Sequence, residues 1–160
     1  MSTWAIVWSM MNESAVAGAM RGSTWLYPVV EVVHIVGFSV LVGSVAMFDL
    51  RVLGFGRSVA VQAAGSMLLP WSVISLFAIV PAGLLLFSAH PNELSENPIF
   101  RLKLFLIGLA GLNALSFHLG VYRTAATWHP RVPGLAQLHA GTSLSIWIGV
   151  ITCGRFLAYT

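Results

Sequence analysis

Four long apolar runs, nearly free of charged residues, are the feature that most limits what this chain can fold into. They cover about residues 26–48, 69–90, 99–122 and 135–157. A helix needs about 20 residues to cross the ~30 Å hydrocarbon layer of a bilayer, and each run is long enough. Only 8% of the 160 residues are charged, against roughly 25% in a soluble domain. The sequence therefore predicts an all-α integral membrane four-helix bundle, with residues 1–160 forming a single transmembrane domain in a lipid bilayer.

The first 24 residues are too polar to form a span of their own. Trp4, Val7, Trp8 and Met11 fall on one helical stripe, but polar residues interrupt it. The segment also lacks the basic start that is typical of a signal peptide. This pattern indicates an N-terminal amphipathic helix that lies along the membrane interface.

Four spans place both ends of the chain on one side of the membrane, here called side A. The loops 50–67 and 123–134 then lie on the opposite side, side B. Lys and Arg divide equally between the two sides, whereas four of the five acidic residues fall on side A. This favours a multi-pass protein of the bacterial inner (cytoplasmic) membrane with side B in the cytoplasm.

Two classes of function are excluded by the distribution of particular residue types. The eight Lys and Arg residues are scattered singly, whereas a nucleic-acid-binding surface gathers them in a patch or stripe. The single cysteine, Cys153, lies in an apolar run. It excludes an intramolecular disulfide and any CxxC redox or zinc motif.

Each of the four spans carries one histidine. Ionisable residues inside a membrane are costly, so each is a candidate functional residue. The chain direction places His34 and His90 toward side A, and His118 and His139 toward side B. Two histidine pairs stacked across a four-helix bundle are the arrangement expected of a dihaem b-type cytochrome, in which imidazoles on facing helices hold the haem iron. His118 and His139 match best in depth, each ~6 Å inside its span at ~1.5 Å per residue.

Glycines accompany two of these histidines. Gly83 stands seven residues before His90, and Gly111 stands seven residues before His118. Two helical turns place each glycine on the face of its histidine, where the lack of a side chain leaves room for a flat macrocycle. The alternative reading is that the glycines serve close packing between membrane helices.

Other charged residues have candidate roles around the same cofactor. Arg101 and Lys103 are candidate partners of haem propionates or of an anionic quinone headgroup, or else anchors whose side chains reach the interface. Glu31 and His34 form an E-x-x-H pair on one helical face, in which Glu31 is a candidate hydrogen-bonding partner or proton donor, or a plain interfacial residue. His129 is interpreted as a solvated loop residue.

One segment also resembles a known family. Residues 25–34 (WLYPVVEVVH), continuing through Gly37 to the DLR triplet at 49–51, are similar to a family of small, uncharacterised bacterial four-helix membrane proteins, and the likeness covers most of the chain. The layout of one histidine per span is also similar to that of the b-type membrane cytochromes that include bacterial superoxide oxidase. This second resemblance implies one or two haem b groups.

We therefore expect a membrane haem b electron-transfer protein, either by itself or as a component of an oxidoreductase, that exchanges electrons with quinone or with a membrane or periplasmic redox partner. With a single haem, His118 and His139 would hold it. Two alternatives stay open at this stage. One is a copper or zinc transport or sensing protein that uses the same histidines. The other is a non-catalytic anchor or assembly subunit of a larger membrane complex, for which a small bundle and a homo-oligomer would suffice.

Overall fold

The computed structural model describes residues 3–128 and 131–159, with side chains from residue 7 onward. Its elements are the α-helices α1 Thr3–Asn12, α2 Ala15–Gly22, α3 Leu26–Leu53, α4 Val61–Ala89, α5 Pro91–Glu96, α6 Pro98–Leu119 and α7 Gly134–Phe156, and the 3-10 helices η1 Val121–Thr127 and η2 Leu157–Tyr159. Four of them, α3, α4, α6 and α7, are long and apolar enough to cross a membrane. The predicted all-α fold with four spans is confirmed.

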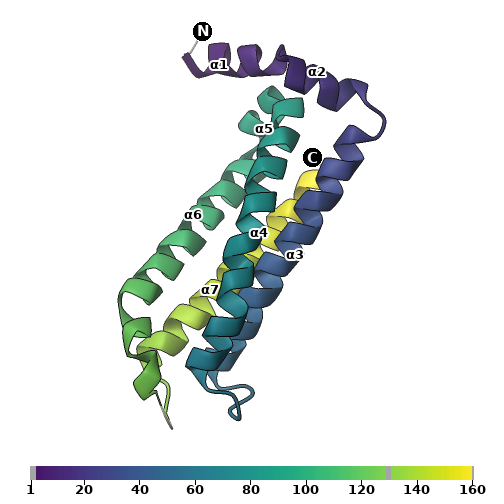
Figure 1. Cartoon of the computed structure of the whole chain (residues 1–160). Coiled ribbons are helices and arrows are strands. Elements are labelled where there is room, and N and C mark those ends of the chain that lie inside the picture. Colours follow the sequence, from purple (N-terminus) through teal and green to yellow (C-terminus); the bar gives the residue numbers. More distant parts are fainter. Residues whose placement is uncertain (1–2, 129–130, 160) are drawn as a thin grey trace.

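The four long helices pack as two hairpins (Figure 1). Helix α3 packs along α4, α6 packs along α7, and contacts between α3 and α7 join the two pairs. Helices α1 and α2 lie across the end of the bundle where α3 begins. The two hairpins thus contact each other through α3 and α7, and much of the surface of α4 and α6 faces outward.

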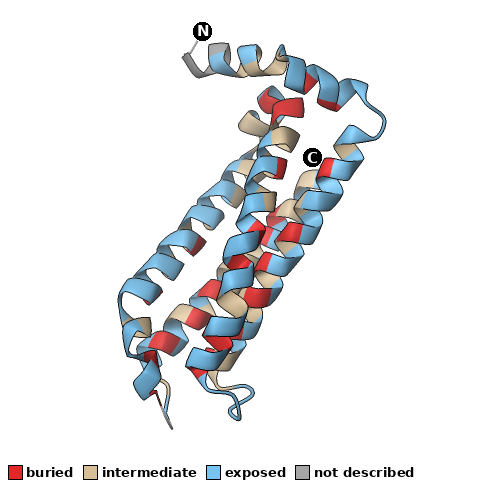
Figure 2. Cartoon of the chain, in the orientation of Figure 1, coloured by how far each residue is buried: buried red, intermediate tan, exposed pale blue. Residues whose placement is uncertain are grey.

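The outer surface of the bundle is apolar. Figure 2 shows α6 exposed along most of its length, and its outward side chains include Leu104, Phe105 and Leu112. On α4 the phenyl ring of Phe77 is 80% exposed. Large apolar surfaces of this kind are avoided by soluble monomers and suit a lipid bilayer, so the chain is a multi-pass membrane protein.

The second membrane helix begins earlier than the sequence predicted. Helix α4 starts at Val61 rather than near residue 69, and it runs through both Pro70 and Pro81. The prediction treated Pro70 as the first turn of the span. Proline is tolerated inside membrane helices because neighbouring groups satisfy the carbonyls that it leaves free.

Local signals set the ends of the other helices. Gly54, with φ 109°, ends α3 in a left-handed conformation, and its N–H donates to the carbonyls of Leu50 and Arg51. The side-chain oxygen of Asn97 accepts hydrogen bonds from the N–H groups of Ile99 and Phe100 and so caps α6. The expected loop at 91–98 is mostly helical, because α5 occupies Pro91–Glu96.

The N-terminal segment forms two short helices instead of one. The Ser14 hydroxyl accepts a hydrogen bond from the N–H of Ala17 and starts α2. Met20 on α2 is buried in an apolar cluster with Val30 of α3 and with Ala82 and Ala89 of α4. Apolar contacts therefore hold the N-terminal segment against the end of the bundle.

Candidate functional site

His34 of α3 is half-buried at the interface with α4, and α4 fixes the orientation of its ring. Its Nδ1 atom is 3.1 Å from the carbonyl oxygen of Ile79. A carbonyl oxygen only accepts hydrogen bonds, so Nδ1 carries the hydrogen and the lone pair lies on Nε2. Histidines that bind metals almost always hold their second ring nitrogen in this way. The ring of His34 is thus oriented as a ligand would be.

A glycine of α4 allows the His34 ring to pack closely against that helix. A Cβ atom added at Gly83 of α4 would lie 3.1 Å from Cε1 of His34, which is closer than ordinary van der Waals contact. The sequence assigned Gly83 to the face of His90. The structure instead places it against His34 across the α3–α4 interface.

Lys103 of α6 approaches the same region from the other hairpin. Its side chain is half-buried, and its Nζ atom lies 3.7 Å from the position of a Cβ at Gly154 on α7. Its charge acts on both His34 and Cys153. Helices α3, α4, α6 and α7 therefore all contribute to one region in the side-A half of the bundle, which we call the His34 site: His34, Gly83, Lys103 and Gly154.

His90 does not join His34. It stands at the C-terminal end of α4, two helical turns beyond Gly83 and so ~10 Å further along the axis. Its side chain is 46% exposed, and its Nδ1 atom lies 3.6 Å from Oε2 of Glu93. The predicted side-A pair of histidines is thus not brought together, because His90 belongs to the surface of the bundle and not to its interior.

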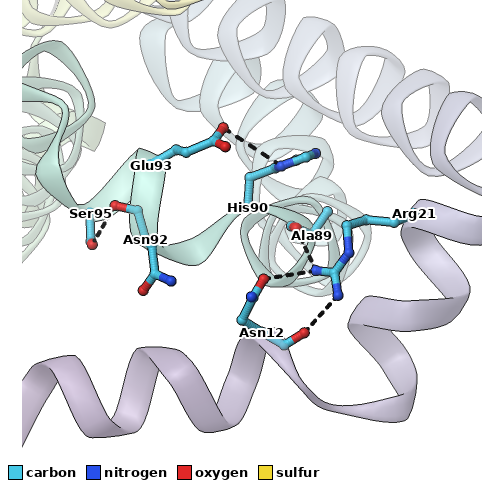
Figure 3. A network of polar contacts seen from close by, with 7 residues as sticks. All are labelled: Asn12, Arg21, Ala89, His90, Asn92, Glu93 and Ser95. Atoms are coloured by element: carbon cyan, nitrogen blue, oxygen red, sulfur yellow. Dashed lines mark hydrogen bonds and ion pairs between the residues drawn. The ribbon is translucent and has the colours of Figure 1, made fainter.

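The surroundings of His90 form a polar network, shown in Figure 3. The guanidinium of Arg21 donates to the Asn12 side chain at 2.9 Å, to the Asn12 carbonyl at 2.7 Å and to the Ala89 carbonyl at 2.8 Å. Arg21 therefore joins the end of α1 to the last turn of α4, where it also satisfies a carbonyl that the helix leaves free. A polar recess of about 300 Å³ lies here, lined by Asn12, Arg21, Ala89, His90, Asn92 and Glu93.

His118 and His139 do not form the predicted side-B pair either. His118 is exposed, and its Nδ1 atom lies 2.8 Å from the carbonyl oxygen of Ala114 on its own helix. His139 is half-buried, and its Nδ1 atom lies 2.8 Å from Oδ1 of Asn113. Asn113 also donates from Nδ2 to the His139 carbonyl at 3.0 Å. Each ring is therefore held by a separate partner.

Aromatic side chains fill the space between these two histidines. The Phe117 ring has its centroid 5.4 Å from that of His118 and 5.8 Å from that of His139. Tyr122 and Trp128 pack on Phe117 in turn. Burial raises the pKa of the Tyr122 phenol. An aromatic cluster of Phe117, Tyr122 and Trp128 therefore lies beside both histidines.

The remaining candidates take surface roles. Arg101 is exposed and donates from Nε to the Ser95 carbonyl at 2.7 Å. Glu31 is exposed and interacts electrostatically with Tyr27. A Cβ at Gly111 would meet no described atom within 4 Å. His129 lies outside the described residues. Of the predicted site residues, the structure brings His34 and Gly83 into contact, and it places Lys103 beside Gly154 of α7.

Two interior polar residues were missed by the sequence analysis. Asp49 is buried, although the DLR triplet indicated a return to water. Asn113 bridges α6 and α7 through His139. A signal for Asp49 was present, because Gly37, Leu41, Ser44 and Phe48 form a buried stripe of α3 that leads to it.

Comparisons with models of protein families, with curated proteins and with solved structures gave no match to this chain. The functional argument therefore depends on the geometry of the site. Within the part of the chain that the structure describes, no group of three or more His, Cys, Asp or Glu side chains is arranged to hold a metal ion.

Proposed function

We propose that this protein binds haem b at the His34 site and transfers electrons within the bacterial inner membrane. The observation that carries the proposal is the orientation of His34, whose Nδ1–H is donated to the Ile79 carbonyl so that Nε2 is free to bind iron. Bound haem would supply a one-electron carrier whose potential depends on its ligands and surroundings. His34 would hold the haem iron through Nε2.

The other residues of the site fit the shape and charge of the same group. Gly83 presents no side chain to the imidazole, so the His34 ring packs closely against α4 and is held in one orientation. Lys103 brings a positive charge into the bundle interior beside α7. An ammonium group there would stabilise a carboxylate such as a haem propionate, because charge pairs strengthen where water is scarce.

This proposal differs from the predicted arrangement of two haems, each held by a pair of histidines, in the residue that binds the iron. His118 and His139 pack against an aromatic cluster, and His90 is paired with Glu93 at the surface. A single haem in the side-A half therefore accounts for the geometry better than two haems held by paired histidines.

A groove beside α4 supports quinone as the electron-transfer partner. This apolar groove has a volume of about 810 Å³ and is lined by α1, α2 and α4 residues that include Met11, Val16, Leu84 and Leu85. Gly83, the neighbour of Leu84 in the chain, contacts His34. We propose that an isoprenoid quinone tail occupies this groove, which places the quinone on the opposite face of α4 from the haem.

The proposal is tested by the haem content of purified protein. Wild-type, His34→Ala and His118→Ala proteins are expressed with added haem precursor, purified in detergent and assayed for haem per chain by the pyridine haemochrome method. We expect about one haem per chain in the wild type and in His118→Ala, and its loss in His34→Ala, because only His34 would bind the iron. His118 is a matched control, since it is also a histidine within a membrane helix.

The same purified proteins also distinguish the two alternative functions, which are metal transport or sensing and an anchor subunit. Bound copper or zinc without haem would favour metal transport or sensing, and neither group would favour an anchor subunit, for which the exposed apolar faces of α4 and α6 are suited. Full haem content in His34→Ala would overturn the assignment of the ligand.

A further inference from the structure

Asp49 is the single aspartate of the chain, and it lies inside the side-B half of the bundle. Its side chain belongs to α3, four residues before the end of that helix at Leu53, and it is 6% exposed. Phe48 and Val52, its neighbours on α3, belong to the buried apolar cluster that includes Phe117 and Ala140. An acidic group is therefore enclosed by apolar side chains.

Only one of its two carboxyl oxygens has a partner. The Ser143 hydroxyl of α7 is positioned as a hydrogen-bond donor to the carboxyl group. Oδ2 is buried and, among the residues that the structure describes, accepts no hydrogen bond. Buried polar atoms are nearly always hydrogen-bonded, so an unpaired carboxyl oxygen needs an explanation.

Among the residues that the structure describes, no cation forms an ion pair with Asp49. Arg51, two residues along the same helix, donates from Nε to the Val59 carbonyl. Arg57 donates to the Gly54 carbonyl at 3.2 Å. In the ranges 3–128 and 131–159, the ion pair found is between His90 and Glu93.

The helices packed against α3 supply little charge at this level. Helix α4 contains no titratable side chain over Val61–Ala89. The titratable residues of α7 are His139, Cys153 and Arg155, and the nearest of them along the helix to Ser143 is His139, whose Nδ1–H is donated to Asn113. The nearby helix η1 contributes Tyr122, which packs on Phe48, and Arg123, which is exposed. An uncompensated buried charge is strongly unfavourable.

We propose that Asp49 is a proton-binding site of the membrane domain. The carboxyl group holds a proton and keeps its hydrogen bond to Ser143, and Oδ2 is the atom at which the proton enters and leaves. The end of α3 lies only ~6 Å further along the helix axis, so the exchange takes place with water on side B. Carboxyl groups inside membrane bundles commonly mark proton routes. This inference does not depend on haem binding.

Because Asp49 is the single aspartate of the chain, an isotope label on aspartate reports on its side-chain carboxyl carbon alone. Cell-free synthesis with [4-¹³C]aspartate labels the Asp49 carboxyl alone, and its infrared C=O band is recorded in detergent at neutral pH, in H₂O and in D₂O. We expect the band of a protonated carboxylic acid that shifts in D₂O, because the proton exchanges with solvent. A carboxylate band at neutral pH, or an acid band that does not shift in D₂O, would overturn the proposal.

Two serine variants test the role of the hydrogen bond. Ser143→Ala removes the partner of Asp49 and should shift the labelled band, whereas Ser145→Ala is a matched control, because the Ser145 hydroxyl is exposed and donates to the Gly141 carbonyl at 2.9 Å. Equal band positions in all three proteins would contradict the assigned environment. The readout is independent of the pigment, so failure here is distinguishable from failure of the haem proposal.

Discussion

Replacing Gly65 by alanine tests how tightly the aromatic cluster closes the side-B end of the bundle. Gly65 is buried on α4, and a Cβ added there would collide with the hydroxyl of Tyr122. It would also lie 3.1 Å from Cζ of Tyr122 and 3.2 Å from Cε2 of Phe48. The Tyr122 and Phe48 rings pack edge to face with centroids 5.8 Å apart, so neither can move without disturbing the other.

The size of the effect follows from two opposing contributions. Overfilling a packed core costs about 1–3 kcal/mol, while replacing glycine by alanine inside a helix gains about 1 kcal/mol. Gly43→Ala, in α3, is the matched control, because its Cβ would meet no described atom within 4 Å and so brings the helical gain alone. We expect Gly65→Ala to be less stable than Gly43→Ala by about 1–3 kcal/mol.

The assay is equilibrium unfolding in mixed detergent micelles, followed by tryptophan fluorescence. Tyr122→Phe removes the hydroxyl that meets the new Cβ, so the double variant should recover part of the loss, and a double-mutant cycle measures the coupling. Equal stability of Gly65→Ala and Gly43→Ala would refute the packing described for this end of the bundle.

Two further substitutions test contacts that join separate helices. Asn113→Ala removes both hydrogen bonds to His139. Since such bonds in membrane proteins average ~0.6 kcal/mol and reach ~1.7 kcal/mol each, the free energy of unfolding in mixed micelles should fall by about 1–3 kcal/mol. An unchanged unfolding midpoint would contradict the geometry. Arg21→Ala removes the hydrogen-bond donors to Asn12 and Ala89. We expect faster hydrogen–deuterium exchange in residues 3–22 and unchanged exchange in α3 and α7. Exchange in residues 3–22 equal to that of the wild type would show that the network is dispensable for docking the N-terminal segment.

The fold was accessible from the sequence because hydrocarbon imposes a simple rule on the chain. Every backbone polar group in the bilayer must be paired internally, so long apolar runs indicate helices, and the predicted all-α fold with four membrane-length helices is confirmed. The error at the start of α4 has a physical origin. Pro70 is typical of a first helical turn, but in a membrane helix it is also accommodated in the interior, and α4 contains it.

The candidate site was less accessible, because depth along a helix does not determine the direction of a side chain. His118 lies in the last turn of α6, which ends at Leu119 instead of near residue 122, and on an exposed face, while its neighbour Phe117 is buried. His34 faces the interior because α3 and α4 approach each other at Gly37 and Gly83, where any Cβ would meet the opposing helix. Helix rotation of this kind is set by packing between helices, which residue spacing within a single helix does not reveal.

Asp49 illustrates the same limit. Next to Arg51, an aspartate near the end of a span is typical of a return to water. The carboxyl group is nevertheless buried, because the inward stripe of α3 continues to the end of the helix, while Arg51 is engaged with the Val59 carbonyl.

The most direct test of the central claim is the visible spectrum of the purified wild-type protein, recorded as dithionite-reduced minus oxidised. The account predicts the α and Soret bands of haem b, at about one haem per chain. A colourless protein, obtained from cells that load haem into a control cytochrome expressed in parallel, would contradict it.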